Sequence, residues 1–475
     1  GFRWLGIDWD EGPTPDGQGS VGQYAPYFQS QRLDKYQTAV QQLLDSGAAY
    51  RDFATPEETV AEREAAEKEK RDFIYSRKWM AETDEQTAAF EADGRKSVVR
   101  LKMPREGKCE FTDLIRGDIS FDWAREQDHV IQRNDGTCLY HLASVVDDHD
   151  FRITHVVRAI EHLSNTPRQI FIAQSLGYPL PQYAHIPFVA EPGKKTKLSK
   201  RKIEQYLKNR EFKKLYDHGV AIADRIGIEP TPESFNPVLV DFYRETGFLP
   251  DAIINYLLLL GWSLDDKTEM FSRDEMTQQF SLERVVKNEA SFDPDKLTAF
   301  QGRYMNDLDL ETKTALCGSF LVRAGVLTEP IPELQLEKLA LIVTAADDRV
   351  VVAGDILQFD GFLADATSLP FEDKAFQKRL VKPENAGHLL AEFKKIMAVT
   401  DDWSAGNLES TLKDWVEQQG IKIGDIIHAL RVALTGKAAG FGMFESMEIL
   451  GREECLTRID VSLKKLEDER NGAAV

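Results

Sequence analysis

The 475-residue chain lacks the features that would tie it to a membrane or to an oxidising compartment. Its longest apolar run is residues 256–260, far short of the roughly 20 apolar residues that cross a bilayer. The four cysteines form no C-x-x-C pair, so neither zinc spacing nor a disulfide framework is indicated. No signal peptide is recognised either, and we therefore expect a cytoplasmic protein without a membrane segment.

The sequence also lacks an initiator methionine and begins Gly1-Phe2-Arg3. We interpret it as a truncated sequence that opens partway through an element, with processing of an N-terminal segment as the alternative. At the other end, we expect residues 471–475 to form a frayed tail.

Basic residues are in deficit over the chain as a whole, with 59 Lys and Arg against 79 Asp and Glu and a net charge of −20. Such a chain repels phosphate at long range, so it can bind a nucleic acid only through a local basic face. Residues 191–214 provide such a face, because they hold ten Lys or Arg against three Glu.

The densest part of this face is a basic loop, residues 194–202, which follows the turn Glu191-Pro192-Gly193. Two interpretations compete. Most charge runs are solvated surface. Alternatively, lysines and a serine hydroxyl on a flexible loop can wrap the triphosphate of ATP.

Periodicity predicts the elements that precede the loop. Helices are expected over 31–46 and 57–78, and the second has Thr55 as N-cap and Pro56 in its first turn. Strands are expected at 97–102, 110–117, 129–133, 138–146, 153–159 and 186–189, with a helix over 165–176. In the last part this order indicates half of an open α/β sheet, in which ligands bind at the carboxyl ends of strands.

Beyond Lys202 the chain is expected to be almost wholly helical. Helical patterns cover residues 252–260, 336–345, 386–396, 408–419 and 423–434.

Residues 137–201 resemble the bacterial-type glutamyl-tRNA synthetases, a family of class I aminoacyl-tRNA synthetases. The matching segments are 140–149, 153–163, 165–169, His185-Ile186-Pro187 and Lys197-Leu198-Ser199-Lys200-Arg201, the last being the family's form of the KMSKS signature. Further matches lie at 4–13 and 27–32, at 247–263, and at 430–436 with 444–447.

The resemblance implies an α/β, Rossmann-like class I catalytic domain with an α+β insertion, followed by all-α stem and anticodon-binding domains. The expected boundaries are 1–49 for the rest of the first half of the catalytic fold, 50–135 for the acceptor-stem-binding insertion, 136–202 for the second half, 203–310 for the stem-contact domain, and 311–475 for the anticodon-binding domain.

The same resemblance implies activation of L-glutamate by ATP with Mg²⁺, followed by transfer to tRNA(Glu), in a monomer. It assigns Lys200 and Lys197 to catalysis. It assigns Lys200, Ser199, Arg201, Glu161 and the backbone of Val189 to ATP.

The glutamate-binding residues implied by the resemblance are Tyr140, Ser144 and Arg158. A structural ion pair is the alternative for Arg158, and a core aromatic is the alternative for Tyr140. Ser144 stands where many members carry Asn. Asp147 and Asp148 could be taken for a metal pair, but we interpret them as turn and helix-capping residues and expect no metal there.

For tRNA the resemblance points to Arg431. Lys208 and Arg210 lie in an apparent insertion, residues 204–240, and an extra tRNA-facing patch there is a hypothesis. No zinc is expected, because the segment 51–54 lacks the cysteines of zinc-bearing members.

Several alternatives stay open at this point. The HIGH signature is absent, so the chain as given is expected to be nearly inactive, and a non-catalytic tRNA-binding protein is one alternative. A ligase that also charges tRNA(Gln) is another. A glutaminyl-tRNA synthetase and an enzyme that glutamylates a tRNA base are disfavoured by the helical region after residue 311.

Overall fold

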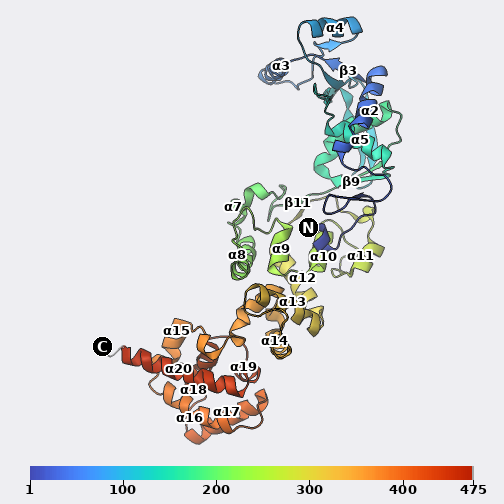
Figure 1. The fold of residues 1–475 in the computed structure, drawn as a ribbon. Coiled ribbons are helices and arrows are strands. Elements are labelled where there is room, and N and C mark those ends of the chain that lie inside the picture. The colour runs from blue at the N-terminus through green and yellow to red at the C-terminus, as the bar shows by residue number, and fades with distance from the viewer. Residues whose placement is uncertain (473–475) are drawn as a thin grey trace. The chain divides into compact units, whose positions relative to one another are not determined.

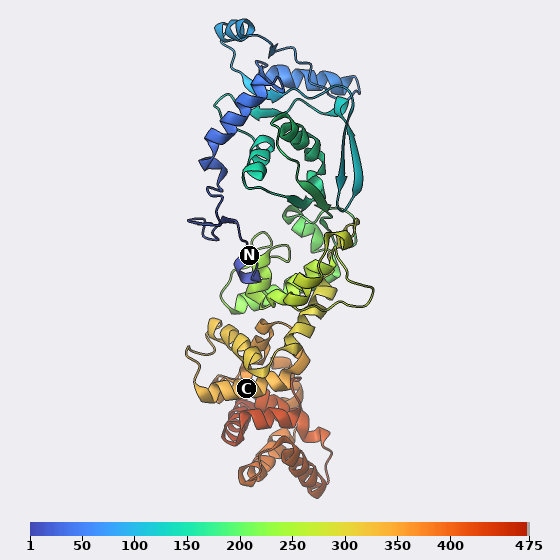
Figure 2. The ribbon, with the colours of Figure 1, turned by 90° about the vertical axis from the view of Figure 1, so that its right-hand side faces the viewer.

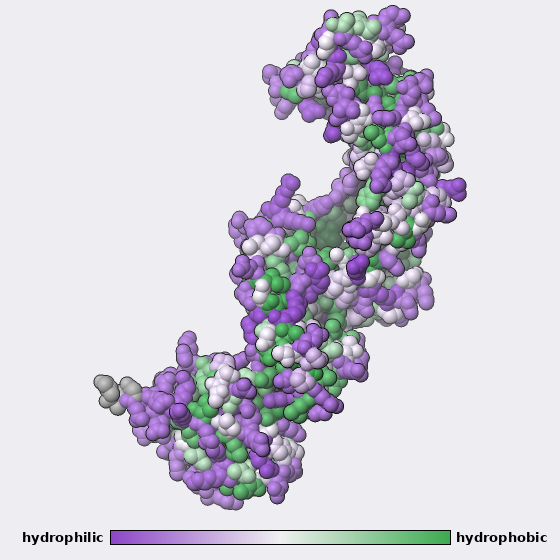
Figure 3. Space-filling model, in the orientation of Figure 1, coloured by the Kyte–Doolittle hydropathy of each residue, from purple (hydrophilic) through white to green (hydrophobic). Residues whose placement is uncertain are grey.

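The structure is a computed structural model that describes residues 1–472. It divides into two compact units. Unit 1 comprises Gly1–Leu198 and Leu257–Phe292, and unit 2 comprises Ser199–Tyr256 and the described residues from Asp293 onward. Hydrophilic residues dominate the face shown in Figure 3. Within residues 1–472, no helix combines the length and the apolar character that a membrane crossing needs.

The sheet that carries the candidate site lies in unit 1 and has the strand order β7-β6-β10-β9. Its strands are β6 (Lys108–Asp113), β7 (Gly117–Asp122), β9 (His155–Ala159) and β10 (Gln182–Ile186). β10 is parallel to both β6 and β9, whereas β6 and β7 form an antiparallel hairpin, the teal pair of long strands in Figure 2. The hairpin thus extends the catalytic sheet, although it falls inside the insertion expected at 50–135.

Three helices pack beside this sheet, α2 (Leu33–Asp45), α5 (Tyr140–Asp150) and α6 (Thr166–Ser175), and α5 contacts both of the others (Figure 1). The predictions of α2 and α6 are confirmed. The strand predicted at 138–146 is wrong, because that segment enters α5. Its apolar residues are a continuous run, which periodicity alone does not separate from a buried helix. Leu142, Val145 and Val146 are buried on one side of α5.

A second, antiparallel sheet in unit 1 has the order β4-β3-β5-β8. Its strands are β3 (Ala49–Asp52), β4 (Met80–Ala81), β5 (Val98–Leu101) and β8 (Val130–Gln132), with helices α3 (Pro56–Lys68) and α4 (Asp84–Ala92). α3 begins at the predicted cap but ends ten residues before the predicted Lys78. Ala66 is its only buried residue, so little packing favours a longer helix.

The strand predicted at 110–117 is two strands. Asp113 ends β6, and its Oδ1 accepts hydrogen bonds from the backbone N–H groups of Ile115 and Arg116. This side-chain turn, together with Gly117 at φ 82°, reverses the chain into β7.

The remaining elements of unit 1 are short. They are α1 (Phe2–Leu5), β1 (Gly12–Pro13), β2 (Ser20–Val21), η1 (Gln29–Gln31), η2 (Trp123–Arg125), η3 (Ile160–Asn165), β11 (Val189–Ala190), α11 (Arg273–Gln279), η5 (Leu282–Arg284) and β12 (Ala290–Ser291). β11 and β12 pair in parallel, which joins residues a hundred positions apart.

Unit 2 is helical, as predicted. Its first helices are η4 (Lys200–Lys202), α7 (Ile203–Tyr206), α8 (Arg210–Arg225), α9 (Val240–Thr246), α12 (Pro294–Asp307), α13 (Leu310–Arg323) and α14 (Glu333–Ala346), and α10 spans Pro250–Leu259. The later ones are η6 (Asp347–Arg349), η7 (Ala353–Phe362), η8 (Ala366–Ser368), α15 (Asp373–Phe376), η9 (Gln377–Val381), α16 (Ala386–Val399), α17 (Ala405–Gln419), α18 (Gly424–Thr435), α19 (Met443–Leu450) and α20 (Arg452–Gly472). The tail predicted at 471–475 is wrong for its first two residues, which belong to α20, and its last three lie outside the described residues.

Helix α8 lies within the apparent insertion, residues 204–240, and packs on α9 and η7 (Figure 1). His218 contacts the buried Asp355 at 2.5 Å, and Arg225 contacts Asp360 at 2.6 Å. Helix α8 therefore braces η7 within unit 2.

Candidate active site

The candidate active site begins at the carboxyl ends of three neighbouring strands. Arg158 on β9 stands opposite His185 on β10, and Tyr183 of β10 stands opposite Asp113 of β6. Ligands of open α/β sheets bind at such strand ends. The parallel register thus gathers an acid, an imidazole and a guanidinium at the edge where a ligand is expected.

These three side chains form a hydrogen-bonded row. His185 Nδ1 lies 2.6 Å from Asp113 Oδ2, and Arg158 Nε donates to His185 Nε2 at 3.1 Å. Arg158 Nη2 donates to Thr166 Oγ1, at the start of α6, at 2.9 Å. The partners of Arg158 in the described chain are thus an imidazole and a hydroxyl, so its alternative reading as a structural ion pair is not what the structure shows.

Helix α5 brings two more predicted residues to this region. Tyr140, in its first turn, is 47% exposed, and its ring lies 6.5 Å from the ring of His162. A side chain as exposed as that of Tyr140 is not part of the hydrophobic core, which excludes the alternative interpretation as a core aromatic. One turn later, Ser144 Oγ accepts a hydrogen bond from Gln169 Nε2 on α6 at 2.8 Å. Gln169 Oε1 is buried and has no hydrogen-bond partner among the described residues.

The segment that leads into the basic loop is a hairpin. Leu198 N–H donates to the Val189 carbonyl at 2.9 Å, and Glu191 N–H donates to the Thr196 carbonyl at 2.7 Å. Gly193 N–H donates to Ser291 Oγ at 2.8 Å, which ties the turn to β12. The loop is therefore anchored at its base, a feature that the sequence pattern did not reveal.

Two of the predicted residues meet through this hairpin. Lys197 Nζ forms an ion pair with Glu161 on η3. The bond from Lys197 is the main cause that lowers the pKa of Glu161, so that carboxylate is ionised at neutral pH. Both side chains are partly exposed, so the pair orients the loop more than it stabilises the fold.

The rest of the predicted signature begins unit 2. Ser199 caps η4, because its side chain accepts a hydrogen bond from Arg201 N–H, and Ser199 N–H donates to Tyr206 Oη at 3.0 Å. Lys200 and Arg201 are exposed. Their positively charged heads are therefore accessible to an anionic ligand.

The interpretation of Asp147 and Asp148 as turn and capping residues is wrong, because both lie inside α5. Asp147 Oδ1 pairs with Arg32 Nε at 2.6 Å and accepts a bond from Tyr36 Oη at 2.8 Å, which fixes α5 on α2. Burial raises the pKa of Asp148 to about 6. No cluster of three or more potential metal ligands occurs among residues 1–472.

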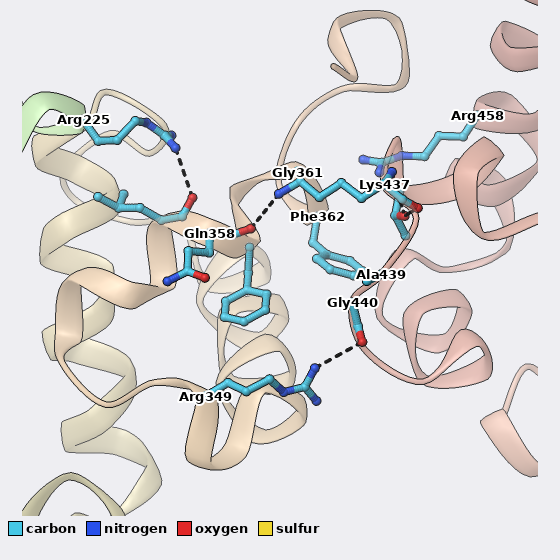
Figure 4. A pocket seen from close by; sticks show the side chains of 12 residues that line it. Arg225, Arg349, Gln358, Gly361, Phe362, Lys437, Ala439, Gly440 and Arg458 are labelled. Atoms are coloured by element: carbon cyan, nitrogen blue, oxygen red, sulfur yellow. Dashed lines mark hydrogen bonds between the residues drawn. The ribbon is translucent and has the colours of Figure 1, made fainter. Parts of the chain in front are cut away.

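Unit 2 contains a separate pocket of about 520 Å³ that carries four cationic side chains. Arg225 and Lys437 donate to the carbonyls of Leu357 and Gln358 at 3.2 and 2.9 Å, and Arg349 donates to the Gly440 carbonyl at 3.2 Å (Figure 4). The fourth cation, Arg458, donates to two further carbonyls. These bonds hold the side chains around the hollow. Arg225 and Arg458 are also paired with Asp360 and Glu454, each at 2.6 Å, so the charge that the described ion pairs leave uncompensated is that of Arg349 and Lys437.

The residues predicted for tRNA lie elsewhere in unit 2. Arg431 is partly buried, and its Nη1 donates to the Phe441 carbonyl at 2.6 Å, so it supports the loop that carries Gly440. Burial is the main cause that lowers its pKa. Lys208 and Arg210 are exposed at the start of α8.

Sequence reasoning gave Asp113 no role and quoted Thr166, Gln169 and His185 only as parts of motifs. Asp113 lies more than 50 positions before Thr166, and His185 lies about 20 positions after it, so no local pattern links all of them. Asp113 lies inside the strand predicted at 110–117 and His185 directly precedes the strand predicted at 186–189, so the predicted strand ends did not single them out.

The chain matches two family models. Residues 1–230 and 236–299 match the catalytic domain of class I tRNA synthetases of the E and Q type. Residues 315–463 match an anticodon binding domain that includes most of the cationic pocket.

Similar proteins cover nearly the whole chain. The glutamate–tRNA ligase of Moorella thermoacetica is 37% identical over 96% of this chain and 85% of its own length. Glutamate–tRNA ligase 1 of Caldanaerobacter subterraneus is 36% identical over 99% of this chain and 87% of its own. The crystal structure of a glutamate tRNA ligase from Elizabethkingia meningosepticum matches with a TM-score of 0.79 and 28% identity over 98% of this chain and 88% of that one. The chain belongs to the glutamate–tRNA ligase family of class I aminoacyl-tRNA synthetases.

Proposed function

We propose that the protein activates L-glutamate with ATP to form glutamyl-adenylate and then transfers the glutamyl group to tRNA(Glu). The observation that carries this proposal is Arg158, a guanidinium at the carboxyl end of a parallel strand, whose outer edge forms no hydrogen bond with the described residues. A guanidinium binds a carboxylate through two parallel hydrogen bonds, which suits the side chain of glutamate.

Around this carboxylate site, Tyr140 and Ser144 would contact the rest of the amino acid. Both lie on α5, whose first turns pack against α6. Ser144 Oγ accepts from Gln169 Nε2 and donates to the His141 carbonyl at 3.4 Å, so a substrate oxygen would take its proton in place of that long bond.

ATP, as its magnesium complex, would be bound by the basic loop. Lys200, Ser199 and Arg201 would face the phosphates, while Glu161 and the backbone of Val189 would lie near the ribose and base. Adenylate formation requires the α-phosphate to accept a carboxylate oxygen while pyrophosphate leaves. Positive charge that stabilises the phosphates in this transition state is therefore the main contribution expected from the loop.

The cationic pocket of unit 2 would bind part of the tRNA. Two of its cations, Arg349 and Lys437, form no ion pair among the described residues, and most of the pocket lies within the matched anticodon binding domain, which supports this assignment. We also propose that the enzyme acts as a monomer in the cytoplasm, since its four cysteines are free thiols, as a reducing compartment favours.

The direct test of the glutamate site is Arg158→Ala in the intact enzyme. The expected result is a rise in the KM for glutamate of roughly 10- to 150-fold, because a charge-assisted bond worth about 1.5–3 kcal/mol is lost. An unchanged glutamate KM contradicts the assignment. Aminoacylation of tRNA(Glu) and tRNA(Gln) side by side decides whether the enzyme discriminates between them.

A further inference from the structure

Arg158 could bind a substrate by itself, but the structure places two buried, hydrogen-bonded side chains behind it, Asp113 and His185. Asp113 and His185 are almost completely buried, with 1% and 0% of their surfaces exposed, and Thr166 is fully buried. Groups that are polar, buried and fully bonded define one arrangement, because any other arrangement leaves a buried group unpaired.

Hydrogen-bond chemistry assigns the proton on His185. A guanidinium Nε–H only donates, so His185 Nε2 must accept. The proton of a neutral imidazole then sits on Nδ1 and is donated to Asp113 Oδ2. Burial lowers the pKa of His185, and the bond to Asp113 only partly offsets this, so the neutral ring prevails at pH 7.

The hydrogen bonds of Asp113 likewise define its ionisation state. Its carboxylate accepts from three backbone N–H groups, those of Ile115, Arg116 and His185, as well as from the imidazole. Burial raises the pKa of Asp113, but these bonds together outweigh burial and lower it. Asp113 is therefore a fixed anion that holds His185 in one tautomer.

Within the described chain, the hydrogen bonds of the row also leave only one edge of the Arg158 guanidinium open to a ligand. Nε and Nη2 form one edge of the guanidinium, and His185 and Thr166 occupy it. The outer edge, formed by Nη1 and Nη2, has no partner among residues 1–472 in the described hydrogen bonds. That edge presents two parallel N–H groups, the geometry that a carboxylate accepts.

We propose that Asp113 and His185 are positioning residues. They fix the guanidinium of Arg158 so that its outer edge donates two hydrogen bonds to the side-chain carboxylate of glutamate. The inference rests on the proposed function of Arg158 as the glutamate-binding residue. A loosened guanidinium still binds, but it distinguishes a carboxylate from a carboxamide less well. The row therefore contributes to the preference for glutamate over glutamine.

The test uses Asp113→Asn, His185→Leu and His185→Gln in the intact enzyme. The amide introduced by Asp113→Asn has the shape of the carboxylate, but it cannot accept from all four donors at once. His185→Leu removes the acceptor for Arg158 Nε, whereas a glutamine at this position can still offer an amide oxygen. The readouts are the KM values for glutamate, ATP and tRNA, and the ratio of kcat/KM for glutamate to that for glutamine.

The expected result is a glutamate KM raised about 10- to 100-fold by Asp113→Asn and His185→Leu, with a smaller rise for His185→Gln. The KM values for ATP and tRNA should stay within about twofold, and the glutamate preference should fall with the rise in glutamate KM. The matched control is Asp147→Asn, since Asp147 is also a buried, hydrogen-bonded carboxylate of unit 1, but it pairs with Arg32 and does not touch Arg158. It should leave the glutamate KM unchanged.

Three outcomes overturn the proposal. The first is an unchanged glutamate KM in folded Asp113→Asn and His185→Gln enzymes when Arg158→Ala raises it. The second is an equal rise for all three substrates, and the third is the same effect from Asp147→Asn. If Arg158→Ala itself has no effect on glutamate, the proposed glutamate site fails, which is a separate result from failure of the row.

Discussion

Lys197 and Lys200 belong to one signature but have different surroundings. Lys197 is paired with Glu161, which holds it at the base of the hairpin. Lys200 is exposed within η4. Of the two, we therefore expect Lys200 to contact ATP phosphates and Lys197 to shape the loop.

Replacing Lys200 by alanine should slow the formation of glutamyl-adenylate by roughly 10- to 150-fold. The change removes one charge-assisted hydrogen bond to the phosphates, worth about 1.5–3 kcal/mol in the transition state. The rate is measured in a single turnover with tRNA present. Lys195→Ala, which removes an exposed lysine from the same loop, is the control and should change the rate less than about twofold. A Lys200→Ala enzyme with an unchanged rate would show that the loop does not bind phosphate.

At the scale of elements, α3 shows how a local signal fixes where a helix begins. Thr55 accepts a hydrogen bond from Glu58 N–H at 3.2 Å, and Glu58 accepts one from Thr55 N–H at 2.8 Å. Glu58 also pairs with Arg95, and the bond from Arg95 is the main cause that lowers its pKa to about 2. The sequence could predict this helix start because the groups that form the capping box lie within three residues of one another.

Thr55→Ala should destabilise the first turn of α3 by about 0.5–2 kcal/mol, because one backbone N–H of the helix start loses its acceptor. Faster hydrogen exchange of the α3 amides is the expected observation. Thr59→Ala, within the same helix, should not accelerate exchange, since alanine is the better helix former. Unchanged exchange in Thr55→Ala would mean that Arg95 and Glu58 suffice to hold the helix start.

The elements that sequence periodicity described best were amphipathic helices with clear stops. α2, α6, α10, α14, α16, α17 and α18 fall within a few residues of their predicted bounds. α5 was predicted as a strand because residues 142–146 are almost continuously apolar. Its helical form depends on packing against α2 and α6, which no local pattern encodes.

At the scale of the whole molecule, the net charge of −20 opposes the binding of a polyanion. Unit 2 offers two local exceptions, the cationic pocket and the exposed start of α8. The bond of Arg225 to Asp360 shows that one end of α8 braces η7, whereas Lys208 and Arg210 at its other end are exposed. The C-terminal end of α8 would thus brace η7, and the residues at its N-terminal end would contact the RNA.

Charge reversal by Lys208→Glu with Arg210→Glu should weaken tRNA binding and make it less dependent on salt. Each lost phosphate contact removes about 0.7–0.9 from the slope of log affinity against log salt concentration. Filter binding of tRNA at a series of salt concentrations measures both quantities. If affinity and slope match those of the unaltered enzyme, the start of α8 does not face the tRNA.

The sequence by itself determined the family and the helical nature of unit 2, because motifs, caps and periodicity are relations between near neighbours. Only the tertiary structure decided which groups meet. Asp113, His185 and Arg158 form a row because parallel pairing of β6, β10 and β9 sets their register, and Lys197 meets Glu161 because a hairpin anchored by Ser291 places it there. Contacts of this kind join residues far apart in the chain, and their energy depends on the register of whole strands rather than on any single stretch.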